Sequence, residues 1–350
     1  MPDWVTGYKL HGSFRGRFEQ FSGENTANID RVRLRYRLLF GLTVNLQDNL
    51  EAGFRLGSGD PKGIGSNPST FSGNPLSQNT TLQYNWSDKN IYIDVAYGKW
   101  TILSSGNWQL AATIGKMENP FNFTWMVFDP DLTPEGGALT GSYSFNDHQN
   151  ITFAAGAFVL GEIASTTHDP FLYGGQILWN AKWTPKLATS IGGGIFQIVS
   201  HDQLIPGVTV PAINQGNFAS AYLNQFVNST NNFMTNQVVY NDTHYTPLIA
   251  DANLIYTLDS FPFYSGPFPI KFTGEYMINT GARDNNNGFW VGVTLGKSGT
   301  KRTWDLTYRY EFLEANAWYD QLEDDDNVAY YATTYYPTYA NPSPGVSKGW

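Results

Sequence analysis

The sequence contains no cysteine, and its five histidines are scattered without a spacing typical of metal ligands. A chain without cysteine forms neither a disulfide framework nor a thiolate metal site. No two carboxylates are spaced in a way that indicates acid–base catalysis, and no glycine-rich stretch precedes a helix that could hold a phosphate. We therefore predict a protein that is not an enzyme and that requires neither a cofactor nor a metal ion.

Two further absences narrow the class of protein. The chain has no run of about 18 or more apolar residues, which excludes a membrane-spanning helix. It also has no basic tail, and its formal net charge is −9. Because nucleic-acid phosphates are bound by clustered cations on an exposed surface, we expect no nucleic-acid partner.

Aromatic residues and glycine, by contrast, are abundant: aromatic residues make up 16% of the chain, and there are 35 glycines. In residues 31–44, every even position is apolar, and the first odd positions are Arg31, Arg33, Arg35 and Arg37. Successive side chains of a strand point to opposite faces, whereas a helix would spread these arginines around its axis. The segment is therefore predicted to be a strand with one apolar face and one charged face.

The same period of two predicts strands along most of the chain. They are expected at residues 8–19, 31–44, 50–57, 91–97, 108–116, 138–145, 151–160, 171–183, 187–199, 248–258, 270–279, 289–295 and 304–312. In the fourth of these strands, we expect Ile91, Ile93, Val95 and Tyr97 on one face and Asp94 on the other. No helical pattern of useful length appears, so the predicted fold class is all-β.

Short turns and long loops alternate between these strands. The turns at residues 45–49 and 184–186 are short, and long loops are expected at 58–90, 117–137, 200–245 and 318–347. This alternation is typical of outer-membrane barrels, whose long loops face outside.

Two folds are compatible with the alternating faces. In a soluble β-sandwich the apolar face would meet a second sheet, and in a membrane barrel it would meet lipid. The aromatic excess favours a transmembrane antiparallel β-barrel, formed as one domain by residues 1–350. Nothing alternates before Trp350, so we expect the sequence shown to stop short of the last strands.

In a barrel, the charged faces would line an aqueous lumen. The expected cationic lining consists of Arg15, Arg17, Arg31, Arg33, Arg35, Arg37 and Arg55. The loop at 117–137 is too apolar to extend into solvent, so we expect it to fold into the lumen and narrow it. The expected anionic lining or constriction consists of Asp94, Glu118, Asp129, Asp131 and Glu135, with the four loop carboxylates facing the arginines. Asp251, Glu275 and Glu311 are expected on an anionic wall opposite them.

Three stretches resemble the outer-membrane porins of Gram-negative bacteria: the arginine-alternating strand, LEAGFRLGSGDP at residues 50–61, and GKMENPF at 115–121 with the acidic, aromatic loop that follows. The resemblance spans most of residues 8–319. It implies a barrel of about 16 antiparallel strands in the bacterial outer membrane, with the lipid bilayer as a partner. It also implies assembly as a homotrimer and passive passage of small hydrophilic solutes. The absence of closing strands departs from the pattern and leaves the strand number open.

We therefore predict an outer-membrane porin with a water-filled channel for passive diffusion of small hydrophilic solutes and ions. The arginines favour a weak local preference for anions, whereas the net acidity opposes it. Three alternatives remain open: a substrate-specific channel for a sugar or an anion, a secreted β-sandwich binding protein without a pore, and a barrel that serves as a scaffold.

Overall fold

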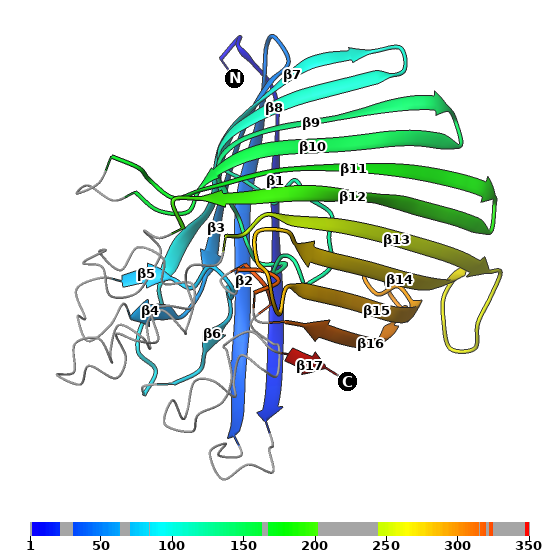
Figure 1. Cartoon of the computed structure of the whole chain (residues 1–350). Helices are drawn as coiled ribbons and strands as arrows, with labels where there is room; N and C mark the ends of the chain where they lie inside the picture. The colour runs from blue at the N-terminus through cyan, green and yellow to red at the C-terminus, as the bar shows by residue number, and fades with distance from the viewer. Residues whose placement is uncertain are drawn as a thin grey trace.

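The chain forms antiparallel β-strands arranged in one large, curved sheet (Figure 1). A computed structural model describes residues 2–21, 31–63, 71–83, 85–162, 167–201, 244–314, 316–319, 322–324 and 347–349. The strands are β1 (Val5–Phe21), β2 (Arg31–Leu46), β3 (Leu50–Ser58), β4 (Pro61–Gly63), β5 (Phe71–Gly73), β6 (Thr80–Thr81), β7 (Ile91–Ser105), β8 (Trp108–Lys116), β9 (Glu135–Asn146), β10 (Gln149–Val159), β11 (Phe171–Thr184), β12 (Leu187–Val199), β13 (Pro247–Leu258), β14 (Phe268–Asn279), β15 (Asn287–Gly296), β16 (Asp305–Leu313) and β17 (Ser347–Gly349). The described residues contain no α-helix, which confirms the all-β prediction.

The large sheet has 15 strands, most of which pair with their neighbours along the chain. The order is β1-β2-β3-β7-β8-β9-β10-β11-β12-β13-β14-β15-β16-β17, and β6 pairs with β2 beside this path. β4 and β5 form a separate two-stranded sheet. Such a meander needs only a turn between neighbouring strands, because antiparallel strands require no crossover. Within the described residues the sheet is open, with β1 and β17 at its two ends.

All thirteen strands predicted from the alternating pattern are confirmed as β1–β3 and β7–β16. Four strands of two or three residues were not predicted: β4, β5 and β6 lie within the expected loop at 58–90, and β17 follows the expected loop at 318–347. So short a strand contains no readable alternation, and its position depends on the edge it pairs with. Most of the predicted loop at 200–245, and most of that at 318–347, lie outside the described residues.

At one end of the sheet, most connections are short turns. Four of them comprise residues 47–49, 106–107, 147–148 and 185–186, but the same end also carries the connections 259–267 and 297–304, which are longer than the connection 280–286 at the other end. The predicted alternation of short turns and long loops therefore holds from β1 to β13 and fails from β13 to β16. In one turn, Lys186 Nζ donates a hydrogen bond to Asp259 Oδ2 at 2.6 Å, which raises the pKa of Lys186. Both side chains are exposed, so this ion pair adds little stability.

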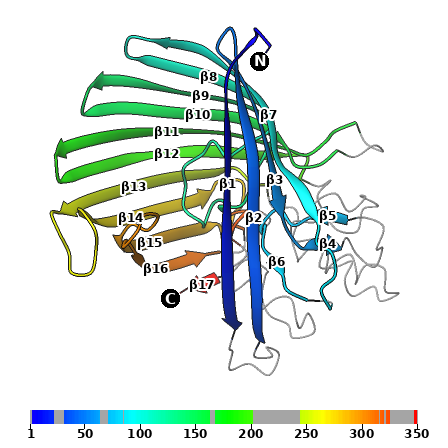
Figure 2. The same cartoon turned by 180° about the vertical axis from the view of Figure 1, so that it is seen from behind.

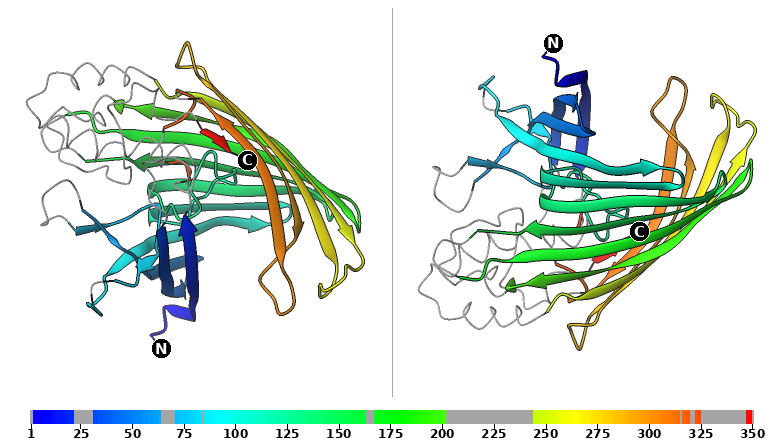
Figure 3. Two further views of the ribbon diagram at one scale, coloured as in Figure 1. Left: turned by 90° about the horizontal axis from the view of Figure 1, so that it is seen from below. Right: turned by 90° about the horizontal axis from the view of Figure 1, so that it is seen from above.

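The two faces of the sheet differ in what covers them (Figures 2 and 3). On β11, Tyr173 and Ile177 point to the convex face and are 45% and 56% exposed, whereas Gln176 and Leu178 on the concave face are 6% and 5% exposed. The chain between β8 and β9 lies on the concave side (Figure 3), where Asn122 forms hydrogen bonds with Gln176. The convex face is therefore apolar and bare, and the concave face holds the buried residues.

The bare apolar surface extends across the whole sheet. Exposed large apolar side chains include Leu10, Phe14, Leu34, Phe40, Phe54, Ile93, Ile114, Ile177, Ile191, Ile195, Leu254, Phe272, Val291 and Leu306. Soluble monomers rarely expose a contiguous apolar patch of this extent. Exposed Trp4, Trp108 and Trp183 lie at or near strand ends, a position typical of the aromatic belts at membrane interfaces.

One predicted face is wrong. Ile91 and Ile93 are exposed, but Val95 is only 3% exposed, and the Tyr97 hydroxyl donates to Glu51 Oε1 at 2.8 Å. The cause is a register shift between β3 and β7, where Arg55 pairs with Val95 and Leu56 with Ile93. At such a bulge, two residues of one strand lie opposite one residue of the other. The alternation of β7 is reversed past this point, so Val95 points to the opposite face from Ile91 and Ile93.

Candidate functional site

The concave face of β1–β3 carries the arginine cluster, which comprises Arg15, Arg17, Arg33, Arg35, Arg37 and Arg55. The register sets Arg15 opposite Arg37 and Arg17 opposite Arg35, and like charges in such pairs repel. The pair beside them sets Glu19 opposite Arg33. Arg31 begins β2, but its side chain lies outside the described part of the chain.

Glu19 is the central counter-charge of the arginine cluster. Its carboxylate is buried, and it accepts from Arg17 Nε at 2.6 Å, from Arg35 Nη1 at 3.4 Å and from Arg33 Nε. A carboxylate shared by several guanidiniums offsets their mutual repulsion through charge-assisted hydrogen bonds. Glu19 was not predicted as a functional residue, although its position on the charged face of β1 was readable from the period of two.

Residues of the connection between β3 and β7 also contact these arginines. Arg35 Nη2 donates to the Asn79 carbonyl at 2.9 Å, and Arg15 Nη2 donates to Asn79 Oδ1 at 2.8 Å. Asp60 lies 3.8 Å from Arg35. β6 pairs with β2 at Arg35 and Tyr36, beyond the part of β2 that β3 covers. This contact was not predicted, because an irregular polar segment carries no period that shows where it docks.

The remaining arginines contact carboxylates from β7 and from the β8–β9 connection. Arg37 Nη1 lies 3.0 Å from Asp131 Oδ1, and Arg55 forms ion pairs with both Asp94 and Glu118. Six arginines therefore face five carboxylates, namely Glu19, Asp60, Asp94, Glu118 and Asp131. Within the described residues, the arginine cluster is therefore part of a mixed network with little net charge.

One of the predicted loop carboxylates, Glu135, contacts a cation outside the arginine cluster. Glu135 pairs with Lys116 at 3.1 Å instead of with an arginine of the early strands, because it opens β9 directly opposite Lys116 at the end of β8. Asp129 is buried and accepts from the Asp131 amide at 2.7 Å.

We call residues 117–134 the inner loop. Its ends are joined by a hydrogen bond from the Met117 amide to the Pro134 carbonyl at 2.9 Å. Between them, aromatic rings pack on Phe196 of β12, with Phe121, Phe123 and Phe128 at centroid distances of 4.8, 5.6 and 5.3 Å. The Phe196 ring lies over Gly174, where a Cβ would meet it at 2.1 Å. Glycine at this position lets the ring lie flat on the sheet and leaves room for the inner loop.

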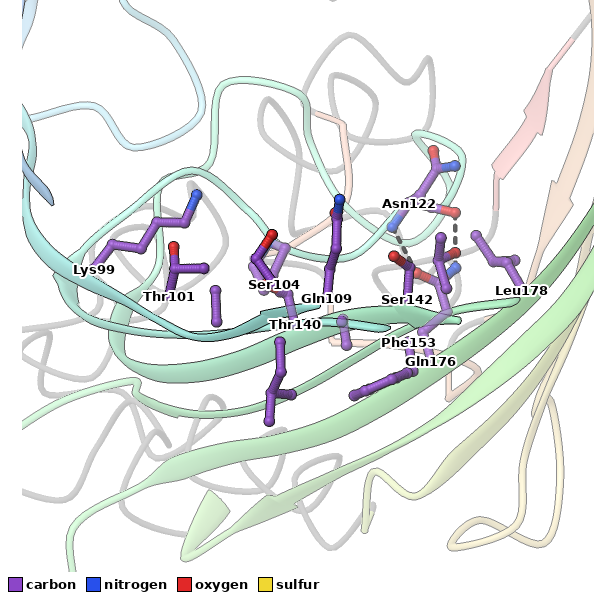
Figure 4. A pocket seen from close by; sticks show the side chains of 16 residues that line it. Lys99, Thr101, Ser104, Gln109, Asn122, Thr140, Ser142, Phe153, Gln176 and Leu178 are labelled. Atoms are coloured by element: carbon purple, nitrogen blue, oxygen red, sulfur yellow. Dashed lines mark hydrogen bonds between the residues drawn. The ribbon is translucent and has the colours of Figure 1, made fainter. Parts of the chain in front are cut away.

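Polar contacts also hold the inner loop to the strands. Thr124 donates to Glu275 twice, from its hydroxyl at 2.5 Å and from its amide at 3.0 Å. Asn122 and Gln176 exchange two hydrogen bonds, at 2.7 and 2.8 Å (Figure 4). Trp318 Nε1 donates to the Val127 carbonyl at 2.7 Å. The inner loop is thus bound to both sides of the concave face as well as to the arginine cluster.

Two cavities adjoin the inner loop, and Asn122 lines both. One, of about 480 Å³, lies over β7–β11 and is lined largely by hydroxyl and amide side chains, including Thr101, Gln109 and Ser142 (Figure 4). The other, of about 520 Å³, lies over β13–β16 and is lined by charged and aromatic side chains. The inner loop therefore has a mostly uncharged polar space on one side and a charged one on the other.

The second cavity adjoins the predicted anionic wall. Asp251, Glu275 and Glu311 are all buried on the concave face, and Lys271 and Arg309 lie among them. We call the three carboxylates the acidic row. Asp251 pairs with Glu275 in the register of β13 and β14, and Trp290 of β15 stands between Glu275 and Glu311.

Within the described ranges, no group of three or more histidine, cysteine or acidic side chains could hold a metal ion. No helix in the same part of the chain is long and apolar enough to cross a membrane.

Comparison with known families defines the class of protein. The model of a family described as "Putative porin" matches residues 22–242, more than half of the chain. The chain belongs to this porin family and is a protein of the outer membrane.

The solved structures that align with this one include outer-membrane proteins. A bacterial polysaccharide outer membrane secretin aligns with a TM-score of 0.41 and 9% identity over 88% of this chain and 83% of that one. The outer membrane channel DcaP of Acinetobacter baumannii aligns at 0.40 and 10% identity over 87% and 90%. OmpT of Vibrio cholerae aligns at 0.34 and 11% identity over 88% and 86%. No curated protein matches the sequence.

Proposed function

We propose that the protein is a porin whose strands close into a transmembrane barrel of about 16 strands, and that its water-filled lumen lets small hydrophilic solutes and ions diffuse passively. The main observation in favour is the contrast between the two faces of the sheet. The convex face is apolar and exposed, and the concave face carries charged side chains, cavities and an inward-folded loop. A sandwich would cover the apolar face with a second sheet.

The inner loop is the proposed constriction. It reaches from Arg37 and Arg55 on one side to Glu275 on the other, so a solute must pass beside it. The proposed lining includes the arginine cluster and Arg31, together with Asp94, Glu118, Asp129, Asp131 and Glu135. Since most of these charges are paired, we expect weak ion selectivity instead of the anion preference that the arginines alone would favour.

The direct test is the current through purified full-length protein in a planar bilayer under a KCl gradient. We expect stepwise openings, and a reversal potential near zero because the paired charges nearly cancel. Current substructure in threes would support the proposed homotrimer. Properly inserted protein that passes no current would contradict the channel proposal, and a reversal potential at the chloride limit would contradict the charge balance.

A charge placed on the convex face tests whether that face meets lipid. Ile191 of β12 is 51% exposed, and its neighbour Ser190 lines a cavity of about 420 Å³ on the opposite face. We expect Ile191→Arg to cost about 2–4 kcal/mol of folding free energy in lipid, as arginine does near the middle of a bilayer. Ser190→Arg should cost much less, because water reaches the concave face. Urea titrations in vesicles would measure both, and equal costs would contradict a lipid-facing convex surface.

A further inference from the structure

The cavity between the inner loop and β13–β16 has features of a binding site as well as of a passage. We propose that it is a subsite for an uncharged, polyhydroxylated solute of the size of one or two sugar rings. This inference rests on the proposed channel, which gives such a solute access to the cavity. The volume of about 520 Å³ lies within the range of small-molecule sites.

The register of β13–β16 explains why the wall is hollow at this level. Trp290 and Arg309 are large, but Gly292 lies between Trp290 and Thr294 on the same face of β15 and has no side chain. The Trp290 indole lies over Gly292, where a Cβ would be 2.6 Å from the ring. The ring is therefore laid against the sheet and does not project across the lumen, which leaves the space above it open.

Three polar atoms of residues that line this cavity lack a hydrogen-bond partner. They are the acceptor Asp251 Oδ1 and the donors Trp290 Nε1 and Arg309 Nη1. Asp251 and Trp290 are only 6% and 8% exposed. Buried polar groups in native proteins are nearly always satisfied, so three unsatisfied atoms on residues around one cavity are unusual. Each of these atoms is covered, so a solute would reach them once the side chains turn toward the cavity. A hydroxyl group can both accept and donate, and a polyol presents several of them.

Other polar groups of the cavity are already paired within the protein. The Glu275 carboxylate accepts a hydrogen bond from the Thr124 hydroxyl, and Asn253 Oδ1 accepts one from the Thr273 hydroxyl at 2.8 Å. The hydroxyl oxygens of Thr294 and Thr307 are hydrogen-bonded to each other at 2.9 Å. The three unsatisfied atoms are therefore set apart from the paired polar groups of the same cavity. In the described part of the chain, the residues that line the cavity over β7–β11 include no such unsatisfied atom, so that cavity serves as an internal comparison.

The charges in the cavity favour a neutral ligand. Asp251 and Glu275 would repel an anion, and Lys271 and Arg309 would repel a cation. An ion would also lose its hydration in a cavity where much of the opposite charge is already compensated. A neutral polyol can bridge Asp251 and Lys271 without that cost.

An aromatic side chain supplies the apolar part of the site. Trp125 of the inner loop is 47% exposed, and the Arg309 guanidinium lies 4.3 Å from the centroid of its ring. The guanidinium covers part of the indole and fixes its orientation through a cation–π contact. The rest of the ring offers an apolar surface for the C–H groups of a sugar, while the polar groups around it bind the hydroxyls.

The test is calorimetric binding of sucrose to the full chain in detergent, combined with block of the current by sucrose in a bilayer. We expect saturable binding that Asp251→Ala and Trp125→Ala each weaken at least about tenfold, since a hydrogen bond to a charged group is lost in the first and stacking in the second. Ser144→Ala, in a separate cavity over β9–β13, should bind sucrose as the unchanged protein does. Asp251→Asn keeps an acceptor and should retain more affinity than Asp251→Ala.

The two readouts separate this inference from the proposed function. A conducting channel that binds no sucrose, or whose sucrose binding is unchanged in both Trp125→Ala and Asp251→Ala, would overturn the subsite while leaving the channel intact. Sucrose binding without any current would overturn passive diffusion but support the subsite. Glycylglycine that binds in place of sucrose would show a zwitterion site and contradict the proposal.

Discussion

Excising most of the inner loop is expected to raise the single-channel conductance several-fold. Replacing residues 119–132 with a short glycine–serine linker removes the rings packed on Phe196 and the contact between Thr124 and Glu275. The two cavities beside the inner loop would then merge into one wider space, because Asn122 lines both. Planar-bilayer recordings measure the change directly.

A milder variant keeps the chain intact if the excised protein fails to fold. Phe196 is 1% exposed and contacts three rings of the inner loop, so Phe196→Ala should cost about 3–5 kcal/mol and loosen that loop. Convex-face Phe272→Ala is the matched control, since its ring is 52% exposed. We expect a lower unfolding temperature and larger, noisier currents for Phe196→Ala only. Unchanged conductance in both inner-loop variants would mean that this loop does not limit permeation.

Glu19→Gln is expected to have the largest effect of any single charge change. The substitution keeps the shape of the side chain but removes the carboxylate that Arg17, Arg33 and Arg35 share. Removing one partner of a buried ion pair costs about 3–5 kcal/mol of folding free energy. For Glu19→Gln we expect a loss of about 3 kcal/mol, because the Arg17 side chain is 33% exposed. The reversal potential should also move toward anion preference, because the concave face loses a negative charge.

Glu135→Gln is the matched control for Glu19→Gln. It makes the same chemical change, but the Glu135 side chain is 65% exposed and has one partner, Lys116. Its effect on unfolding should be small, as for most exposed ion pairs. Comparable losses of stability in the two variants would contradict the central role of Glu19, and an unchanged reversal potential in Glu19→Gln would remove the arginine cluster from the ion path.

The positions and faces of the long strands were readable from the sequence because a strand has a period of two. The alternation in 31–44 predicted β2, and the same rule placed Asp251 and Glu275 on the concave face before their partners were known. The rule failed at Val95, where a register shift against Arg55 reverses the alternation. A bulge depends on how two strands fit together, so the sequence of either strand alone does not predict it.

The sequence by itself determined the all-β fold, the long strands, and the separation of apolar from charged side chains, because these follow from local periodicity. Only the tertiary structure decided which charges meet. The pairs of Glu19 with Arg33 and of Asp131 with Arg37, and the contact of Thr124 with Glu275, join residues up to 151 positions apart. Such contacts depend on how the sheet curves and where an irregular loop docks, and neither leaves a period in the sequence. The balance of charge on the concave face, and with it the expected ion selectivity, is therefore a property of the fold.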